Sequence, residues 1–114
     1  MGHRGKITTH VLDTASGKPA AGIRIRMTRL ADQQCLADVI TNADGRCAAP
    51  LLSGDQMQAG RYRLDFHVGD YFSSPDEVAF LDVVPVDFGV TDSDAHYHIP
   101  LLISPYGYST YRGS

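Results

Sequence analysis

The sequence predicts an all-β protein, a two-sheet antiparallel β-sandwich of about eight strands with one short helix. Apolar and polar residues alternate with a period of two along most of the chain, which is typical of strands that bury one face. Segments rich in glycine, proline, asparagine, aspartate and serine separate the alternating stretches at short intervals. The 114 residues, 43% of them hydrophobic and 20% charged, are enough for one folded domain, residues 1–114.

Three stretches show the alternation most clearly. In 23–28, isoleucine and methionine alternate with arginine and threonine. In 61–68, tyrosine, leucine, phenylalanine and valine alternate with arginine, aspartate and histidine. In 84–90, valine and phenylalanine alternate with proline, aspartate and glycine. Each stretch predicts a half-buried strand with one face on the core.

A single short helix is expected, over residues 69–74 or alternatively over 75–81. Turn chemistry fills the boundaries between the strands, because glycine, proline, asparagine and serine favour tight turns. The turns expected on this basis are 16–19, 42–45, 53–55 and 104–107.

Two further strands, 7–14 and 96–103, depart from the simple pattern. The face turned away from the core carries a leucine beside His10 in the first, and Leu102 beside two histidines in the second. A second apolar face usually meets another subunit, so this pattern predicts an oligomer with histidines in its interface. Pro100 cannot donate to a strand ladder and must occupy a position that needs no hydrogen bond.

Charge and composition exclude several classes of protein. The net charge of −3 leaves no basic stripe, so we expect no nucleic-acid partner. No apolar run approaches the roughly 20 residues of a membrane helix, so we expect no membrane partner. The polar start leads straight into a strand pattern without a secretory signal, which favours a cytoplasmic protein. Cys35 and Cys47 are interpreted as small buried apolar groups in preference to a disulfide.

Candidate chemistry centres on His96 and His98, which share a strand face about 7 Å apart. With His10 as a third ligand they could hold zinc, but no carboxylate or cysteine cluster matches them, so no metal site is assigned. The alternative is a pair of histidines facing solvent or a neighbouring subunit. By spacing alone Arg46 is a solvated turn arginine, and Ser109 lacks the surroundings of a nucleophile.

Three segments together carry a family resemblance. They are TTHVLDT at 8–14 followed by GKPA at 17–20, NADGR at 42–46, and HYHIPLLISPYGYSTYRGS at 96–114. The chain, from about residue 6 to its last residue, resembles the 5-hydroxyisourate hydrolase branch of the transthyretin family. The closing YRGS is the most specific part, because the transthyretin carriers lack it.

The resemblance implies a homotetramer, a dimer of dimers around a central channel. The active sites would lie in that channel, where the strands that start at Lys6 and His96 meet the C-terminal tail of another subunit. The catalytic residues implied are His10, Arg46 and His98, where the carriers hold lysine, glutamate and threonine. His96 matches a family position but receives no role. The substrate-binding residues implied are His10, Arg46, Ser109, Tyr111, Arg112, Gly113 and Ser114.

The implied reaction is hydrolysis of 5-hydroxyisourate, from urate degradation, to 2-oxo-4-hydroxy-4-carboxy-5-ureidoimidazoline. Opening an activated cyclic amide needs a base for water and a positive group for the oxyanion, and no cofactor. We expect His98 to be the base and His10 to orient water or substrate, although these roles are exchangeable. Arg46 would bind the anionic ring. Two alternatives remain: a carrier that binds a small aromatic ligand in the channel, and a purely structural sandwich.

Overall fold

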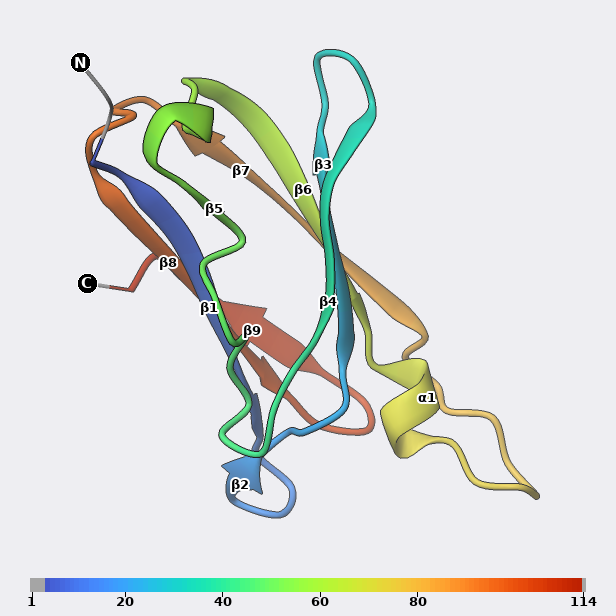
Figure 1. Cartoon of the computed structure of the whole chain (residues 1–114). Helices are drawn as coiled ribbons and strands as arrows, with labels where there is room; N and C mark the ends of the chain where they lie inside the picture. Colours follow the sequence, from blue (N-terminus) through green and yellow to red (C-terminus); the bar gives the residue numbers. More distant parts are fainter. Residues whose placement is uncertain (1–3, 114) are drawn as a thin grey trace.

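The computed structural model describes residues 4–113, which form two facing β-sheets (Figure 1). Ser114, predicted to bind substrate, lies outside the described residues. Nine strands, one short α-helix and one 3-10 turn make up this part of the chain. They are β1 (Lys6–Asp13), β2 (Lys18–Pro19), β3 (Arg24–Arg29), β4 (Gln34–Ile40), β5 (Leu52–Ser53), η1 (Gly54–Gln56), β6 (Gly60–His67), α1 (Gly69–Phe72), β7 (Val83–Val90), β8 (His96–Ile103) and β9 (Tyr108–Thr110).

The predicted sandwich is confirmed, with one departure from antiparallel pairing. The first sheet, here the β8 sheet, has the order β2-β1-β8-β9 with β5 also paired to β1, and the second, the β6 sheet, has the order β4-β3-β6-β7. Among the described strand pairs, β1 and β8 alone run parallel. These strands come from opposite ends of the chain, so no hairpin turn dictates their relative direction.

The core lies between the sheets and consists of the apolar residues predicted to face inward. Side chains such as Ile7 and Val11 on β1, Ile25 on β3 and Leu64 on β6 are fully buried. Burial alternates strictly along β1 and along the second half of β6, as a period of two requires. The two layers therefore hold one another through a single apolar core.

Helix α1 occupies the first of the two predicted ranges, and residues 75–81 form a loop without helix. The Tyr71 hydroxyl of α1 donates a hydrogen bond of 2.9 Å to the buried carboxylate of Asp13, at the end of β1. This contact ties the helix to the β8 sheet. No helix within residues 4–113 has the length and apolar character needed to cross a membrane.

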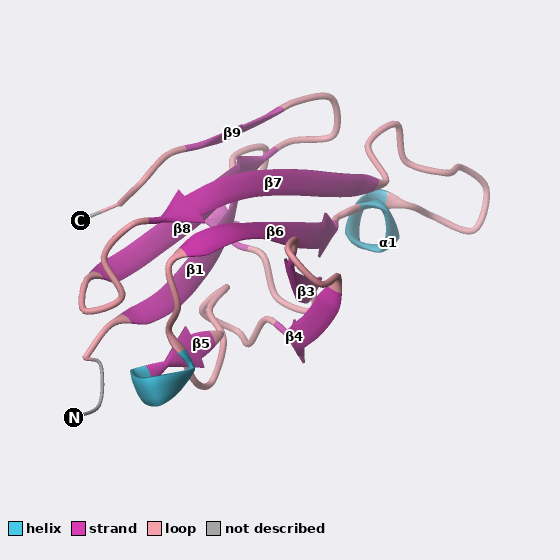
Figure 2. Ribbon diagram, turned by 90° about the horizontal axis from the view of Figure 1, so that it is seen from above, coloured by secondary structure: helices cyan, strands magenta, loops and turns pink. Residues whose placement is uncertain are grey.

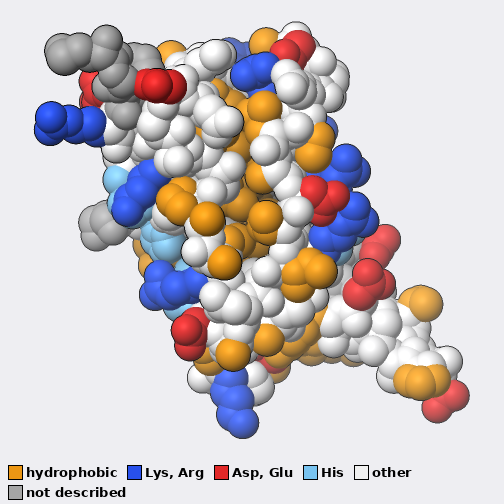
Figure 3. All heavy atoms as spheres, in the orientation of Figure 1, with side chains coloured by type: hydrophobic (Ala, Val, Ile, Leu, Met, Phe, Trp, Pro, Cys, Tyr) orange, Lys and Arg blue, Asp and Glu red, His pale blue; other side chains and the backbone are white. Residues whose placement is uncertain are grey.

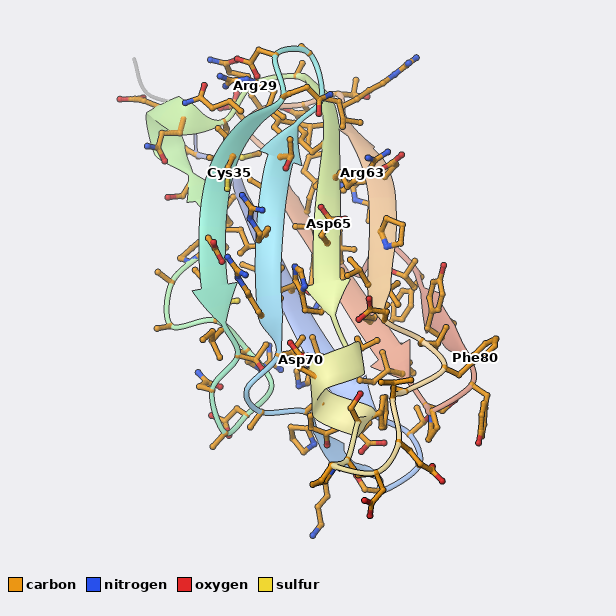
Figure 4. All side chains as sticks on the ribbon, turned by 90° about the vertical axis from the view of Figure 1, so that its right-hand side faces the viewer. Arg29, Cys35, Arg63, Asp65, Asp70 and Phe80 are labelled. Atoms are coloured by element: carbon orange, nitrogen blue, oxygen red, sulfur yellow. The ribbon has the colours of Figure 1, made fainter. Side chains whose placement is uncertain are left out.

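Both cysteines are free, and the expectation that Cys35 is buried is wrong. A β-bulge between Met27 and Thr28 shifts the β3–β4 register, so that Cys35 pairs with Thr28 instead of lying opposite Arg29. A one-residue shift turns a side chain to the other face of the sheet, and Cys35 is consequently exposed on β4 (Figure 4). Cys47 is half-buried.

Pro100 interrupts the ladder between β8 and the C-terminal segment. The amide of Ser104 donates to the Gly107 carbonyl and that of Gly113 to the His98 carbonyl, so every second residue of β8 turns its backbone toward the tail. Pro100 falls on this series but has no N–H, and its carbonyl accepts from the Thr110 hydroxyl at 2.7 Å. Strand β9 accordingly ends at Thr110. It lies at the same edge of the sandwich as β7 (Figure 2).

Candidate functional site

The outer face of β1 and β8 carries the candidate site. The parallel register pairs Lys6 with His96, Thr8 with His98, and His10 with Pro100. Polar side chains from two strands far apart in sequence therefore form one row. The space-filling view shows the histidines gathered on this side of the molecule among lysine and arginine side chains (Figure 3).

One hydroxyl lies between two imidazoles in this row. The Thr8 Oγ1 atom is 2.6 Å from His96 Nε2 and 2.8 Å from His98 Nδ1, both within hydrogen-bond distance. The ring centroids of the two histidines are 6.1 Å apart, with an angle of 62° between the ring planes. The two histidines are thus joined through Thr8, and their rings also form an edge-to-face pair.

A tight loop after β4 brings Arg46 to the same face. The Asn42 side-chain oxygen accepts hydrogen bonds from the amides of Asp44, at 2.9 Å, and Arg46, at 3.2 Å. Gly45 has a φ of +73°, and an added side chain there would collide with the Val11 carbonyl oxygen. The Gly45 carbonyl accepts from the Val11 amide at 2.8 Å, which places Arg46 opposite the His10 backbone. Arg46 is therefore held against β1 by its loop.

These residues surround an open pocket of about 500 Å³. Arg46 and Lys6 give the pocket two cationic side chains, and His96 and His98 give it two imidazoles. His10 lies next to Arg46 but is not part of this lining. The lining residues are Lys6, Thr8, Thr9, Arg46, Cys47, Ala48, Ala49, Pro50, His96 and His98.

The surroundings favour the neutral form of all three histidines in the row. Burial, together with the positive field of His96, Arg46 and His10, lowers the pKa of His98. Burial and then Arg46 lower the pKa of His10, against smaller opposing effects of Asp44. Burial and Lys6 lower the pKa of His96. A neutral imidazole is the form that can accept a proton near neutral pH.

The C-terminal tail closes one side of His98. The amide of Gly113 donates to the His98 carbonyl at 2.7 Å, and a Cβ added to Gly113 would lie 2.7 Å from His98 Cδ2. The Arg112 guanidinium lies 4.2 Å from the centroid of the Tyr97 ring, and its Nη2 is 3.5 Å from the His96 carbonyl oxygen. The tail therefore reaches the histidine row through its backbone and glycine.

The remaining predicted binding residues lie elsewhere in the single chain. Tyr111 and Arg112 line a second hollow, of about 330 Å³, between β7 and the tail. Ser109, on β9, pairs with Leu102 of β8. Its side chain is exposed and lines neither pocket. The resemblance assigned these residues to a pocket shared between subunits, and that assignment remains a prediction.

Two groups in the pocket were not assigned a role from the sequence. Thr8 and Lys6 read as ordinary strand residues, and their place beside His98 and His96 depends on the parallel register, which alternation alone does not specify. The zinc hypothesis needed His10 as a third ligand, and His10 is not part of the pocket lining that contains His96 and His98. Residues 4–113 contain no group of three or more His, Cys, Asp or Glu side chains placed to hold a metal ion.

Comparisons with known proteins agree with this fold. A model of the HIUase/Transthyretin family matches residues 7–113. A 5-hydroxyisourate hydrolase from Ralstonia nicotianae is 56% identical over 117 residues, covering 96% of this chain and 99% of the relative. The structure of Klebsiella pneumoniae 5-hydroxyisourate hydrolase superposes with a TM-score of 0.82 at 36% identity, covering 98% and 95% of the two chains. The structure of sea bream transthyretin in complex with thyroxine superposes with a TM-score of 0.85 at 28% identity, covering 95% of this chain and 94% of that chain.

Proposed function

The chain belongs to the HIUase/transthyretin family, and on that premise we propose that it hydrolyses 5-hydroxyisourate. The observation that carries this proposal is the pocket in which a neutral His98 lies beside Arg46 and Lys6. It occurs in a chain 56% identical to a bacterial 5-hydroxyisourate hydrolase. A base and a cluster of positive charge are the two groups that hydrolysis of a cyclic amide requires.

In the proposed reaction, His98 accepts a proton from water while the water oxygen adds to the ring carbonyl carbon of the substrate. Arg46 and Lys6 stabilise the negative charge that develops on the carbonyl oxygen. The ring C–N bond then breaks, and the proton held by His98 passes to the leaving nitrogen. The product is 2-oxo-4-hydroxy-4-carboxy-5-ureidoimidazoline, and every step uses groups of the protein and water. His10, next to Arg46, orients the water or the substrate.

We further propose that the active form is a homotetramer, a dimer of dimers. The outer face of the β8 sheet is open in the single chain, and apolar residues continue it beyond the histidine row. Leu102 is half-buried there, and Tyr111 is 61% exposed at the sheet edge. Packing two such faces together would enclose the pocket and bring Ser109 and Tyr111 of one subunit toward the site of another.

A carrier function is the second candidate, favoured by the likeness to a transthyretin solved with thyroxine. The polar, cationic lining of the pocket opposes it, because small apolar ligands prefer pockets lined mainly by apolar side chains.

A direct assay separates the two candidates. 5-Hydroxyisourate is generated freshly from urate, and the decay of its near-ultraviolet absorbance is followed with and without the protein. The hydrolase predicts decay well above the spontaneous rate. If the folded protein leaves the substrate decaying at its spontaneous rate and instead binds an aromatic ligand such as thyroxine, the carrier function would be established. Light scattering of the same sample measures the oligomeric state independently.

A further inference from the structure

The Thr8 hydroxyl lies within hydrogen-bond distance of two histidine rings. A threonine hydroxyl has one hydrogen to donate and lone pairs to accept, and here it contacts His96 Nε2 and His98 Nδ1 at once. It can donate to only one of these nitrogens, so when it does, the other must donate to it. The tautomer of His98 is therefore linked to that of His96. We call this three-residue arrangement the Thr8 bridge.

The lengths of the two contacts give the bridge a direction. Hydrogen bonds donated by hydroxyls span about 2.5–3.0 Å, and those donated by N–H groups span about 2.7–3.2 Å. The 2.6 Å contact to His96 Nε2 lies in the hydroxyl range alone, so we assign the Thr8 hydrogen to it. The 2.8 Å contact lies in both ranges, and because the hydroxyl has a single hydrogen, donation there falls to His98 Nδ1–H. This assignment makes His96 the acceptor at the end of the bridge.

The charges around His98 favour the same direction. Arg46 and His10 act on His98 from the loop and from β1, Lys6 acts on His96, and the tail adds Arg112 near the His96 carbonyl. Arginine and lysine have only hydrogen-bond donors, so an imidazole nitrogen that faces them is stabilised by carrying a lone pair. Among the described residues, no hydrogen bond engages His98 Nε2. That nitrogen remains free to act on a substrate or a water molecule.

We propose that Thr8 and His96 are positioning residues that hold His98 in its Nδ1–H tautomer and thereby leave Nε2 unprotonated as the base. The proposal rests on the proposed hydrolase function and adds a role for His96, whose side chain had none. It also distinguishes His98 from His10 as the base, because the bridge orients His98 alone. Hydrogen-bond partners that fix the tautomer of a metal-ligating histidine typically contribute about 10- to 100-fold, and we expect an effect of the same order here.

The test compares two matched substitutions at one position. Thr8→Val keeps the shape of the side chain and removes the hydroxyl, whereas Thr8→Ser keeps the hydroxyl. We expect Thr8→Val to lower kcat about 10- to 100-fold with little change in KM, and Thr8→Ser to retain kcat within about threefold. His96→Phe removes the acceptor and should lower kcat similarly. If the role of Thr8 is purely structural, kcat does not depend on the hydroxyl, and folded Thr8→Val and Thr8→Ser have the same kcat.

Nitrogen-15 NMR of the histidine rings provides a readout that is independent of activity. In the wild-type protein His98 should show a protonated Nδ1 and an unprotonated Nε2, and in Thr8→Val this tautomer should lose its dominance. An Nε2–H tautomer of His98 in the wild type would overturn the proposal, as would wild-type kcat in folded Thr8→Val. Failure of the wild type to accelerate substrate decay would refute the hydrolase function, while the NMR result would still decide whether the bridge exists.

Discussion

Substituting Gly113 with alanine tests whether the tail positions His98, the proposed base. The new Cβ would lie 2.7 Å from His98 Cδ2 and 3.3 Å from Cγ. Non-bonded carbon atoms prefer about 3.5–4.0 Å, so the ring or the tail must move by roughly 0.8 Å or more. A displacement of about 1 Å at a reacting group can lower a rate by about 100-fold. We therefore expect kcat/KM to fall about 10- to 100-fold in Gly113→Ala.

The stability of the same variant should change little. If the tail moves, the protein loses the hydrogen bond from the Gly113 amide to the His98 carbonyl, worth about 1 kcal/mol. Thermal melting should consequently shift by only a few degrees, about what 1 kcal/mol produces in a domain of this size. Gly107→Ala is the matched control, because its nearest neighbour, Ser104 Oγ, would be 3.8 Å from the new Cβ. Wild-type kcat/KM in Gly113→Ala, measured by substrate decay, would show that the tail does not position His98.

Three further predictions concern stability, pH and metals. Tyr71→Phe removes a hydrogen bond to the carboxylate of Asp13, which is 5% exposed. The free energy of unfolding, measured by urea titration, should therefore fall by about 1.5 kcal/mol. Tyr106→Phe, at an 81% exposed position, is the control and should leave the free energy of unfolding unchanged. The pKa values of His10, His96 and His98 are lowered on folding, so the unfolded chain binds more protons. The free energy of unfolding should therefore fall as pH drops below about 6.5. In a plot of kcat against pH, the midpoint of the decrease on the acid side should also lie below about 6.5. A midpoint at or above about 6.5 would contradict the lowered histidine pKa values. Hydrolysis of 5-hydroxyisourate should persist in the presence of a strong chelator. Activity that is lost in the chelator and returns when zinc is added would show a metal requirement.

Much of the sandwich could be predicted because burial follows the alternation of residues. Strands β3, β6 and β7 each bury one face against a common core, and the pattern of side chains records this directly. Strands β2, β5 and β9 have only two or three residues, too few to show any period. Strands β2 and β9 pair with the strands just before them, β1 and β8, whereas β5 pairs with β1, which is distant in sequence.

The errors have equally physical causes. Cys35 is exposed because of a single bulge in the β3–β4 ladder, and the alternation of residues along β4 does not predict the extra residue. The parallel direction of β1 and β8 depends on how two ends of the chain meet in the folded sheet. Local sequence contains no signal for that choice.

The candidate site was predictable in its residue types but not in its connections. Resemblance to a family singled out His98, Arg46 and the tail, and the structure brings Arg46, His98 and Gly113 to one face. The contact of Thr8 with both imidazoles needed the register of β1 on β8. For Ser109 and Tyr111, a single chain does not supply the second subunit that the prediction requires.

In the proposed reaction His98 acts as a base and not as a structural residue. The most direct test measures 5-hydroxyisourate decay and thermal melting together for the wild type, for His98→Ala and for His67→Gln, whose histidine lies on β6 in the other sheet. Removing a catalytic base predicts a loss of about 10²–10⁴-fold in turnover, whereas the lost hydrogen bond to Thr8 changes stability by only about 1 kcal/mol. We expect that large loss of turnover in His98→Ala, with a nearly unchanged melting temperature, and wild-type turnover in His67→Gln. Turnover that falls only in proportion to the folded fraction of His98→Ala would contradict the account.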